Sequence, residues 1–431
     1  MSGSVMAFGE LSRFLETVRD WTLSNGVRAL YRQRSGSSLA TFQMWYKVGS
    51  RDEPVGRTGL SHLVEHMMFK GTDRTGPEEF SRIIQAQGGQ ANAFTTKDFT
   101  AYYVVMASDR IPLAMDLERD RMRGLKLRED HFLSEKKVVM EERRLRTETQ
   151  PEAVLVEELE AVAFCSHPYR WPIIGWMEDI EGISLADVRS HWRAHYAAGN
   201  LLVVGISDVE PDSWLELLES RFGDLPVRKP RGHREIVEPP QRAERRVLVR
   251  RQAQVGVLAL AYHVPRISHR DAPALEVLAC LLGSGRSSRL YRRLVRQEGL
   301  ALGVEVEYPL LSLSPGLFKI LVRILPGGSL ERAEGAVQEE LERLCGPDPQ
   351  LEGDLQRAKE HLERAFVLSL DSLMAQALLM AQYELCAGWK CLGQYLPGIR
   401  AVTPEAVREA VRRYLCGENR STGWLVPSKR G

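Results

Sequence analysis

The sequence predicts an α+β protein made of two tandem homologous domains, each a mainly antiparallel sheet with helices packed on one face. Three observations support this fold class: the length, a repeated order of elements and a proline-rich boundary. The chain has 431 residues, more than one hydrophobic core usually supports, so two domains are expected. The boundary is predicted at residues 226–245, where four prolines interrupt a highly charged stretch. Residues 1–225 would form the first domain and residues 246–431 the second.

The same order of strand, strand and helix occurs twice along the chain. The expected strands are residues 27–33 and 39–48 in the first half, and residues 246–251 and 255–264 in the second. Each pair leads into a helical stretch, at residues 60–69 in the first half and at residues 272–282 in the second. Only the first of these two stretches contains a pair of histidines.

The first helical stretch carries the sequence His-Leu-Val-Glu-His at residues 62–66. A helix advances about 100° per residue, so His62 and His66 lie one turn apart on one face, with Glu65 within reach of the same ion. Two neutral imidazoles can bind Zn²⁺, and a carboxylate beside them can take a proton from a metal-bound water. This spacing is a known signature of zinc hydrolases. Because the neighbouring residues are apolar, burying these polar groups without a partner would be costly, which favours a metal over a purely structural role.

A catalytic zinc site needs a third protein ligand. Residues 129–145 predict a helix. The apolar residues expected to mark its buried side are Val138, Val139 and Leu145. With the helix phased on Val138, Glu142 falls at about 40° and Glu135 at about 60°, so both should face the core. Glu141 falls at about −60° and should lie at the solvated edge, whereas the inward Glu142 needs a cation such as a metal on the first helix.

Residues 62–66 followed by Glu142 resemble the pitrilysin and insulin-degrading enzyme family of inverted-motif zinc metallopeptidases, particularly its short bacterial branch related to mitochondrial processing peptidase. The resemblance implies that the zinc ligands are His62, His66 and Glu142, and that Glu65 is the general base. It also implies that Glu135, seven residues before Glu142, is the supporting second glutamate of the family. In that family two such domains form half of a clamshell, and a second pair of domains closes it.

Residues 88–95 resemble the edge strand on which this family lays the backbone of its substrate. The resemblance implies substrate contacts at Asn92, Ala93, Phe94 and Thr95. The next strand is expected around Tyr102–Val105 because this run is rich in aromatic and β-branched residues. An edge strand can bind an extended peptide by strand addition without requiring a particular substrate sequence. The alternative is a glycine-started hairpin with no role in binding.

The second half departs from the pattern of the family. There, an arginine followed seven residues later by a tyrosine, just after a Gly-Leu-Ala stretch, contributes to substrate binding from the opposing half. Gly299–Ala301 supplies the stretch here, but Val295 and Leu302 occupy the positions of the pair. Arg296 is one residue out of register and Tyr308 lies too far along. The resemblance therefore implies that these donors come from another chain, either a homologous subunit without the zinc motif or a second copy.

These observations predict a zinc metallo-endopeptidase subunit that cleaves extended or unstructured peptides. Two alternatives stay open: a subunit dedicated to processing a leader or precursor peptide, and a non-catalytic core or scaffold subunit of the same fold. A net charge of +1 and the lack of a nucleic-acid-binding motif argue against a nucleic-acid partner. No run approaches the roughly 18 apolar residues of a membrane helix, so no membrane partner is expected. The first residues do not resemble a signal peptide, so we expect a cytoplasmic protein, or a periplasmic one if a signal peptide has been removed.

Overall fold

The computed structural model describes residue 9 and residues 11–227 and 236–428, so the middle of the predicted boundary segment lies outside the described residues. The strands of the first sheet are β1 (Val18–Thr22), β2 (Arg28–Gln33), β3 (Leu39–Tyr46), β4 (Gln90–Thr95), β5 (Thr100–Ala107) and β6 (Leu201–Ser207). The strands of the second sheet are β7 (Arg245–Arg251), β8 (Val257–Val264), β9 (Ala301–Glu307), β10 (Gly316–Ile324) and β11 (Arg420–Pro427). All four strands of the predicted repeat are therefore present.

Helices alternate with these strands in both halves. The first half contains α2 (Leu60–Met67), α3 (Glu79–Ala86), α4 (Ile111–Gly124), α5 (Glu129–Arg143), α6 (Pro151–Ala163), α7 (Met177–Gly182), α8 (Leu185–His195) and α9 (Pro211–Phe222). The second half contains α10 (Ala272–Gly283), α11 (Leu330–Cys345), α12 (Leu351–Ser369), α13 (Leu373–Cys386), α14 (Tyr395–Ala401) and α15 (Pro404–Tyr414). A π-helical turn, η3 (Arg144–Glu148), continues from the end of α5.

The strand order shows that the two halves repeat one topology. The first sheet runs β1-β2-β6-β3-β5-β4 and the second runs β7-β11-β8-β10-β9. In each sheet the first strand of the repeat pairs in parallel with the last, as β2 does with β6 and β7 with β11, and the other pairs are antiparallel. The tandem α+β architecture with mainly antiparallel sheets is confirmed, and β1 is an addition to the first half. The exact domain boundaries stay a prediction.

Alternation along β3 divides its side chains between two cores. Phe42 and Met44 belong to the core between the first sheet and its own helices. Trp45 points to the opposite face, where it packs with α13 of the second half. Both faces of β3 are buried from Ala40 to Tyr46, and this includes the polar Thr41 and Gln43.

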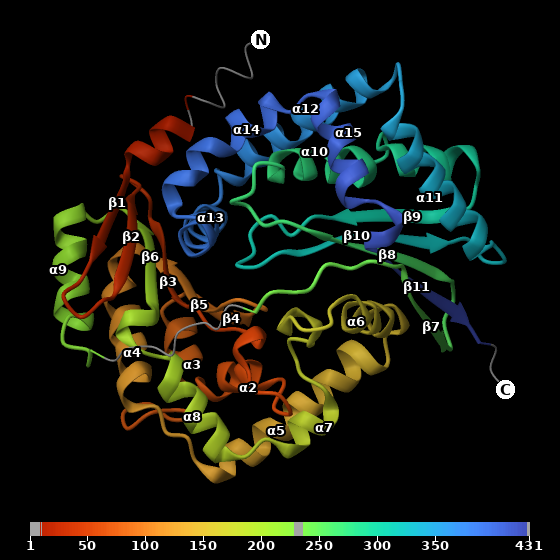
Figure 1. Cartoon of the computed structure of the whole chain (residues 1–431). Coiled ribbons are helices and arrows are strands. Elements are labelled where there is room, and N and C mark those ends of the chain that lie inside the picture. The colour runs from red at the N-terminus through yellow and green to blue at the C-terminus, as the bar shows by residue number, and fades with distance from the viewer. Residues whose placement is uncertain (1–8, 10, 228–235, 429–431) are drawn as a thin grey trace.

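The two halves exchange helices across their junction, which the sequence did not predict. In Figure 1, α13 lies beside the first sheet and α6 lies beside the second sheet. Ala377 and Met380 of α13 are fully buried in the core that contains Trp45. Leu155 and Leu159 of α6 are buried against the second sheet. Each sheet thus has its own helices on one face and a helix from the other half on its opposite face.

No single helix in the described part of the chain is long and apolar enough to cross a membrane, and α12 with α13 passes such a test only as a pair bent by 111°.

Candidate metal centre and substrate groove

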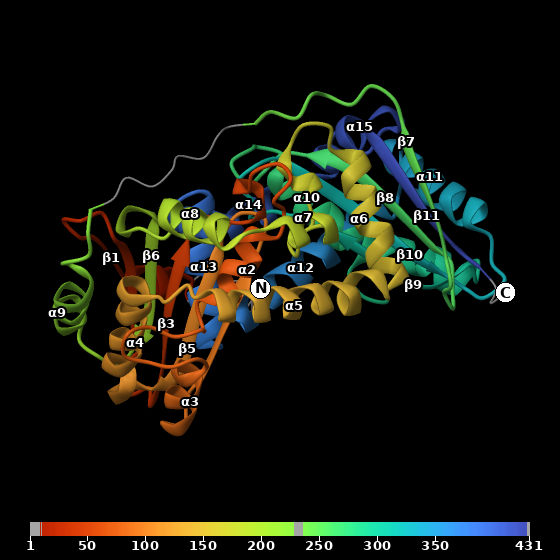
Figure 2. The same ribbon diagram turned by 90° about the horizontal axis from the view of Figure 1, so that it is seen from below.

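The two motif histidines lie side by side on α2. Their ring centroids are 4.7 Å apart, as expected for residues one helical turn apart. The rest of α2 is buried: Leu60, Leu63, Val64 and Met67 belong to the core of the first half. This packing fixes the helix in place, and the two imidazoles face α5, which runs beside α2 in both views of the molecule (Figures 1 and 2).

Glu142 of α5 reaches the histidine pair. Its Oε2 lies 3.3 Å from Nε2 of His66 and 3.8 Å from Nε2 of His62. One ligand atom from each of these three residues lies within 4.8 Å of the others, and no other such group was found in the described ranges. The three residues predicted as zinc ligands are therefore brought together. Glu141 instead points to solvent and pairs with Arg144, as expected.

The direction predicted for Glu142 was right, but two residues used to phase the helix are not buried. Val139 is fully buried, whereas Val138 is 46% exposed and Leu145 is 66% exposed. Leu145 lies in η3, where the chain leaves regular α-helical geometry, so extrapolation at 100° per residue no longer applies. Val138 lies close in angle to Glu142, on the side of α5 that borders the open metal centre.

Glu135 lies behind His66, on the side of α5 that faces the histidine pair. Its Oε2 lies 3.2 Å from Nδ1 of His66, and its Oε1 lies 2.7 Å from Nζ of Lys70. Burial would raise the pKa of Glu135, but the hydrogen bonds from His66 and Lys70 outweigh burial and lower it. Lys70 was not expected from the sequence, because it lies three residues beyond the end of α2 at Met67, where helical spacing no longer applies.

The electrostatics of the cluster fit a divalent cation. Burial and the adjacent His66 ring lower the pKa of His62 to about 4, so this imidazole is neutral and has a lone pair available. Burial would also lower the pKa of His66, but hydrogen bonds to Glu135 and Glu142 outweigh it and raise this pKa to about 9. The cluster thus attracts positive charge, because carboxylates surround the imidazoles. Two imidazole nitrogens with one carboxylate form a donor set that suits Zn²⁺.

Glu65 lies beside the cluster and contacts the strand predicted to bind substrate. Its Oε2 accepts a hydrogen bond of 2.6 Å from the hydroxyl of Thr95. Burial raises the pKa of Glu65 despite this hydrogen bond, which makes its carboxylate a stronger base than an exposed one. Thr95 therefore fixes the orientation of Glu65, a contact that the sequence did not reveal. A second contact missed from the sequence is the ion pair of Glu142 with Arg146, at 2.9 Å.

The predicted substrate strand, β4, forms one edge of the first sheet. It pairs with β5 through contacts such as Asn92↔Tyr103 and Thr95↔Thr100, and its other side has no strand neighbour among the described residues. The Oδ1 of Asn92 accepts a hydrogen bond of 2.8 Å from the N–H of Ala93. The ring of Phe94 packs edge-on against Trp45, with the centroids 5.4 Å apart. An extended peptide could add to the outer side of β4, beside Glu65.

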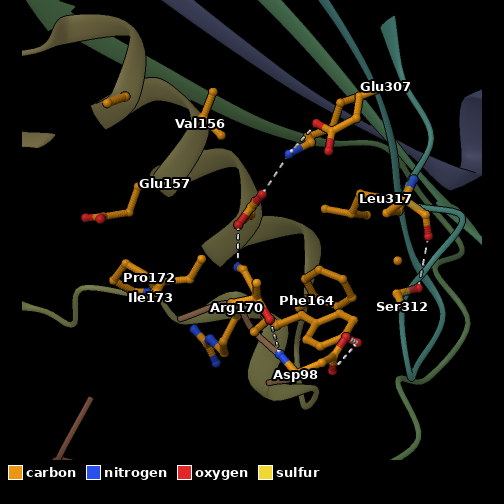
Figure 3. A pocket seen from close by; sticks show the side chains of 18 of the residues that line it. Asp98, Val156, Glu157, Phe164, Arg170, Pro172, Ile173, Glu307, Ser312 and Leu317 are labelled. Carbon is orange, nitrogen blue, oxygen red and sulfur yellow. Dashed lines mark hydrogen bonds and ion pairs between the residues drawn. The ribbon is translucent and has the colours of Figure 1, made fainter. Parts of the chain in front are cut away.

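A cavity of about 870 Å³ begins where β4 ends and continues between α6 and the β9–β10 hairpin (Figure 3). A chain of alternating charges crosses it from one half to the other. Lys97 contacts Glu160 at 2.5 Å, and Lys319 lies 3.1 Å from both Glu160 and Glu307. Burial opposes ionisation of Glu160, but the two ammonium groups lower its pKa to about 2. The cavity also has apolar walls, which include Val156, Phe164 and Leu317.

Val295 and Leu302 stand at the positions expected for the arginine and tyrosine, and Arg296 and Tyr308 lie near them in sequence. Leu302 is 51% exposed on β9, and Val295 packs against the core of the second half. Tyr308 is buried, and its hydroxyl donates to the carbonyl of Pro265 at 2.7 Å. The guanidinium of Arg296 lies 5.9 Å from the ring of Tyr291. Tyr308 is therefore engaged within its own half.

Comparison with known proteins agrees with this architecture. Residues 28–175 match the family model described as insulinase, peptidase family M16, and residues 182–362 match the one described as peptidase M16 inactive domain. The zinc protease PqqE of Helicobacter pylori is 31% identical over 366 residues, which cover 84% of this chain and 82% of that protein. The β subunit of the mitochondrial processing peptidase of Lentinula edodes is 26% identical and covers 91% of this chain and 86% of that protein.

Solved structures show the same fold. The crystal structure of a protease from Helicobacter pylori superposes with a TM-score of 0.88 at 28% identity and covers 95% of this chain and 99% of that chain. The periplasmic protease PqqL of Escherichia coli superposes with a TM-score of 0.79 at 17% identity, covering 96% of this chain and 48% of that longer chain. The sequence and fold therefore show that this chain belongs to the insulinase family of peptidases, M16.

Proposed function

We propose that this chain is the catalytic subunit of a zinc metallo-endopeptidase that cleaves extended or unstructured peptides. The observation that carries the proposal is the convergence of two imidazole nitrogens and one carboxylate oxygen within 4.8 Å, at the edge of the first sheet. His62, His66 and Glu142 would hold the metal. Relatives named as zinc proteases support this assignment.

Each residue around the cluster has a distinct role in the proposal. When bound, zinc would polarise the scissile carbonyl and acidify the attacking water. Glu65 would take the proton from that water at its carboxylate and deliver it to the leaving amine. Glu135 would hold the ring of His66 through Nδ1, as acidic groups behind metal-binding histidines commonly do. Thr95 would keep the carboxylate of Glu65 beside the substrate strand.

The edge strand β4 would bind the substrate backbone. Strand addition uses main-chain hydrogen bonds, so it selects extended chains over folded ones. Asn92, Ala93, Phe94 and Thr95 would contact the peptide along this edge. The cavity beyond Thr95 is large enough to hold further residues of the same peptide.

A second chain would complete the enzyme, and we propose a homologous subunit without zinc or a second copy. Val138 and Leu145, four residues before and three residues after Glu142, are exposed apolar side chains that a closing partner would cover. PqqL is about twice as long as this chain, and the part of PqqL that superposes on this chain is 48% of PqqL. Closure would exclude water and so strengthen the electrostatic contacts at the reacting carbonyl.

A dedicated processing role is the second candidate, favoured by the similarity to the β subunit of a mitochondrial processing peptidase. A purely structural subunit would not need the intact His62, His66 and Glu142 cluster with Glu65 beside it. Cleavage of one precursor but not of unrelated unstructured peptides would favour the processing role.

The test measures zinc content and peptide cleavage in matched variants. His62→Ala and His66→Ala should lose bound zinc in elemental analysis. Glu65→Gln should keep zinc but lose nearly all cleavage, because its carboxylate is proposed as a base and not as a ligand. Metal content that none of these substitutions changes, together with full activity of Glu65→Gln, would contradict the proposal.

A further inference from the structure

A buried carboxylate that takes no part in the proposed chemistry holds the start of α2. Glu53 lies between the turn η1 (Ser50–Asp52) and α2, and it is 5% exposed. Its Oε2 accepts a hydrogen bond of 2.8 Å from the N–H of Gly59, and its Oε1 accepts one of 2.7 Å from the N–H of Ser61. Because Ser61 directly precedes His62, the carboxylate acts one residue away from a proposed zinc ligand.

The helix cannot supply this cap itself. The first amides of a helix have no partner within it, and the residue at the N-cap usually provides an acceptor from its side chain. Here the N-cap is Gly59, which has no side chain and a φ of +89°. A Cβ at this position would lie 2.4 Å from the carbonyl oxygen of Ile174, so a capping side chain cannot be introduced there. Glu53 supplies the acceptors from outside the helix. Burial raises the pKa of its carboxyl despite the hydrogen bonds from the two amides, so its contribution at this helix end comes from these hydrogen bonds and not from its charge.

Further contacts anchor the same end of α2 to the surrounding first half. The hydroxyl of Ser61 donates to the carbonyl of Gly49 at 2.9 Å and lies 3.1 Å from Nε2 of His191. Asp179 accepts hydrogen bonds from both the N–H and the hydroxyl of Thr58, at 3.1 and 2.6 Å. The first turn of α2 is therefore fixed relative to η1, α7 and α8. Of these contacts, Glu53 alone binds two amides that flank the helix start.

This anchoring matters because the proposed ligands come from two different helices. His62 and His66 lie on α2, whereas Glu142 lies on α5. The helix α2 has eight residues, a length at which a helix depends on tertiary contacts for its stability. If its first turn frays or rotates, His62 moves relative to Glu142 and the three donors no longer converge.

We propose that Glu53 is a positioning residue for the metal centre: by holding the amides of Gly59 and Ser61, it keeps His62 in register with His66 and Glu142, and so increases the affinity for zinc. The inference rests on the proposed zinc function. Groups that orient metal ligands without touching the metal commonly change metal affinity by about 10- to 100-fold. We expect an effect of this size for Glu53→Ala.

The experiment measures Zn²⁺ affinity by competition with a chromophoric chelator, using the full chain. Glu53→Ala should bind zinc at least about 10-fold more weakly than the wild type. Glu53→Gln keeps one acceptor oxygen and should fall between the two. The matched control is Ser329→Ala, which removes a cap hydrogen bond of 3.1 Å at the start of α11 in the second half and should leave zinc affinity unchanged.

Circular dichroism of the metal-free proteins separates positioning from a general loss of folding. Wild-type zinc affinity in folded Glu53→Ala would overturn the inference. Should Glu53→Ala not fold, unchanged affinity in Glu53→Gln would overturn it equally. A wild type that binds no zinc would instead contradict the proposed function itself, and with it this role of Glu53.

Discussion

Glu160 should stabilise the junction between the two halves by about 3 kcal/mol at neutral pH. Glu160 lies on α6, the helix of the first half that packs against the second sheet. It contacts Lys97 of the first half and Lys319 of the second half. Its pKa of about 2, compared with an ordinary value of 4.5, corresponds to about 3 kcal/mol at about 1.4 kcal/mol per pH unit. Because the pKa is depressed in the folded protein, this stabilisation is fully present above pH 4.5 and is lost as the pH falls towards 2.

Urea unfolding of the wild type and of Glu160→Gln would measure this contribution. The variant should be less stable by about 3 kcal/mol at pH 7, and the difference should shrink to about 2 kcal/mol at pH 3.5. The control is Glu152→Gln on the same helix, whose partner Arg323 is 37% exposed, so its loss should cost less than about 1 kcal/mol. Equal stability of Glu160→Gln and the wild type at pH 7, or a difference that grows on acidification, would refute the reasoning.

Three further predictions concern the proposed metal ligand Glu142, the partly buried acid Glu276 and the partner. Glu142→Ala should lose zinc in elemental analysis, whereas Glu141→Ala should keep it; the opposite pattern would show that Glu141 is the ligand. Burial outweighs a hydrogen bond from Tyr395 and raises the pKa of Glu276 to about 7. Because the unfolded chain then ionises this group at a lower pH than the folded protein, Glu276 should lower the stability of the wild type by at most about 3 kcal/mol as the pH rises from 4.5 to 7. Glu276→Gln should abolish this loss in thermal unfolding. The chain alone should cleave an unstructured peptide poorly and gain activity with a zinc-less homologue or on self-association; full activity of a verified monomer that no partner increases would rule this out.

Much of this architecture could be predicted because it is encoded in local patterns. The strands at residues 28–33 and 39–46 carry β-forming residues between turn signals, and the histidine spacing follows from one turn of helix. The edge position of β4 followed from a resemblance to the family. The direction of Glu142 depended on helical periodicity, which held as far as the end of α5 at Arg143.

Other features depend on contacts between distant parts of the chain. Val138 is apolar but exposed, because it borders the open site and not the core. The exchange of α6 and α13 between the halves leaves no signal in either helix, since both are apolar enough to pack on any sheet. Glu53 could not be recognised as a cap, because it lies six and eight residues before the amides it binds. Such contacts are set by the folded chain and not by sequence spacing.

X-ray absorption at the zinc edge of the purified protein tests the central claim most directly. The account predicts one zinc per chain, with nitrogen and oxygen neighbours at about 2.0–2.2 Å and an imidazole scattering pattern that weakens in His62→Ala. The chain also contains six cysteines, so adventitious binding would be recognised by sulfur neighbours at about 2.3 Å. Zinc held through sulfur, or an imidazole signal unaffected by loss of His62, would contradict the account.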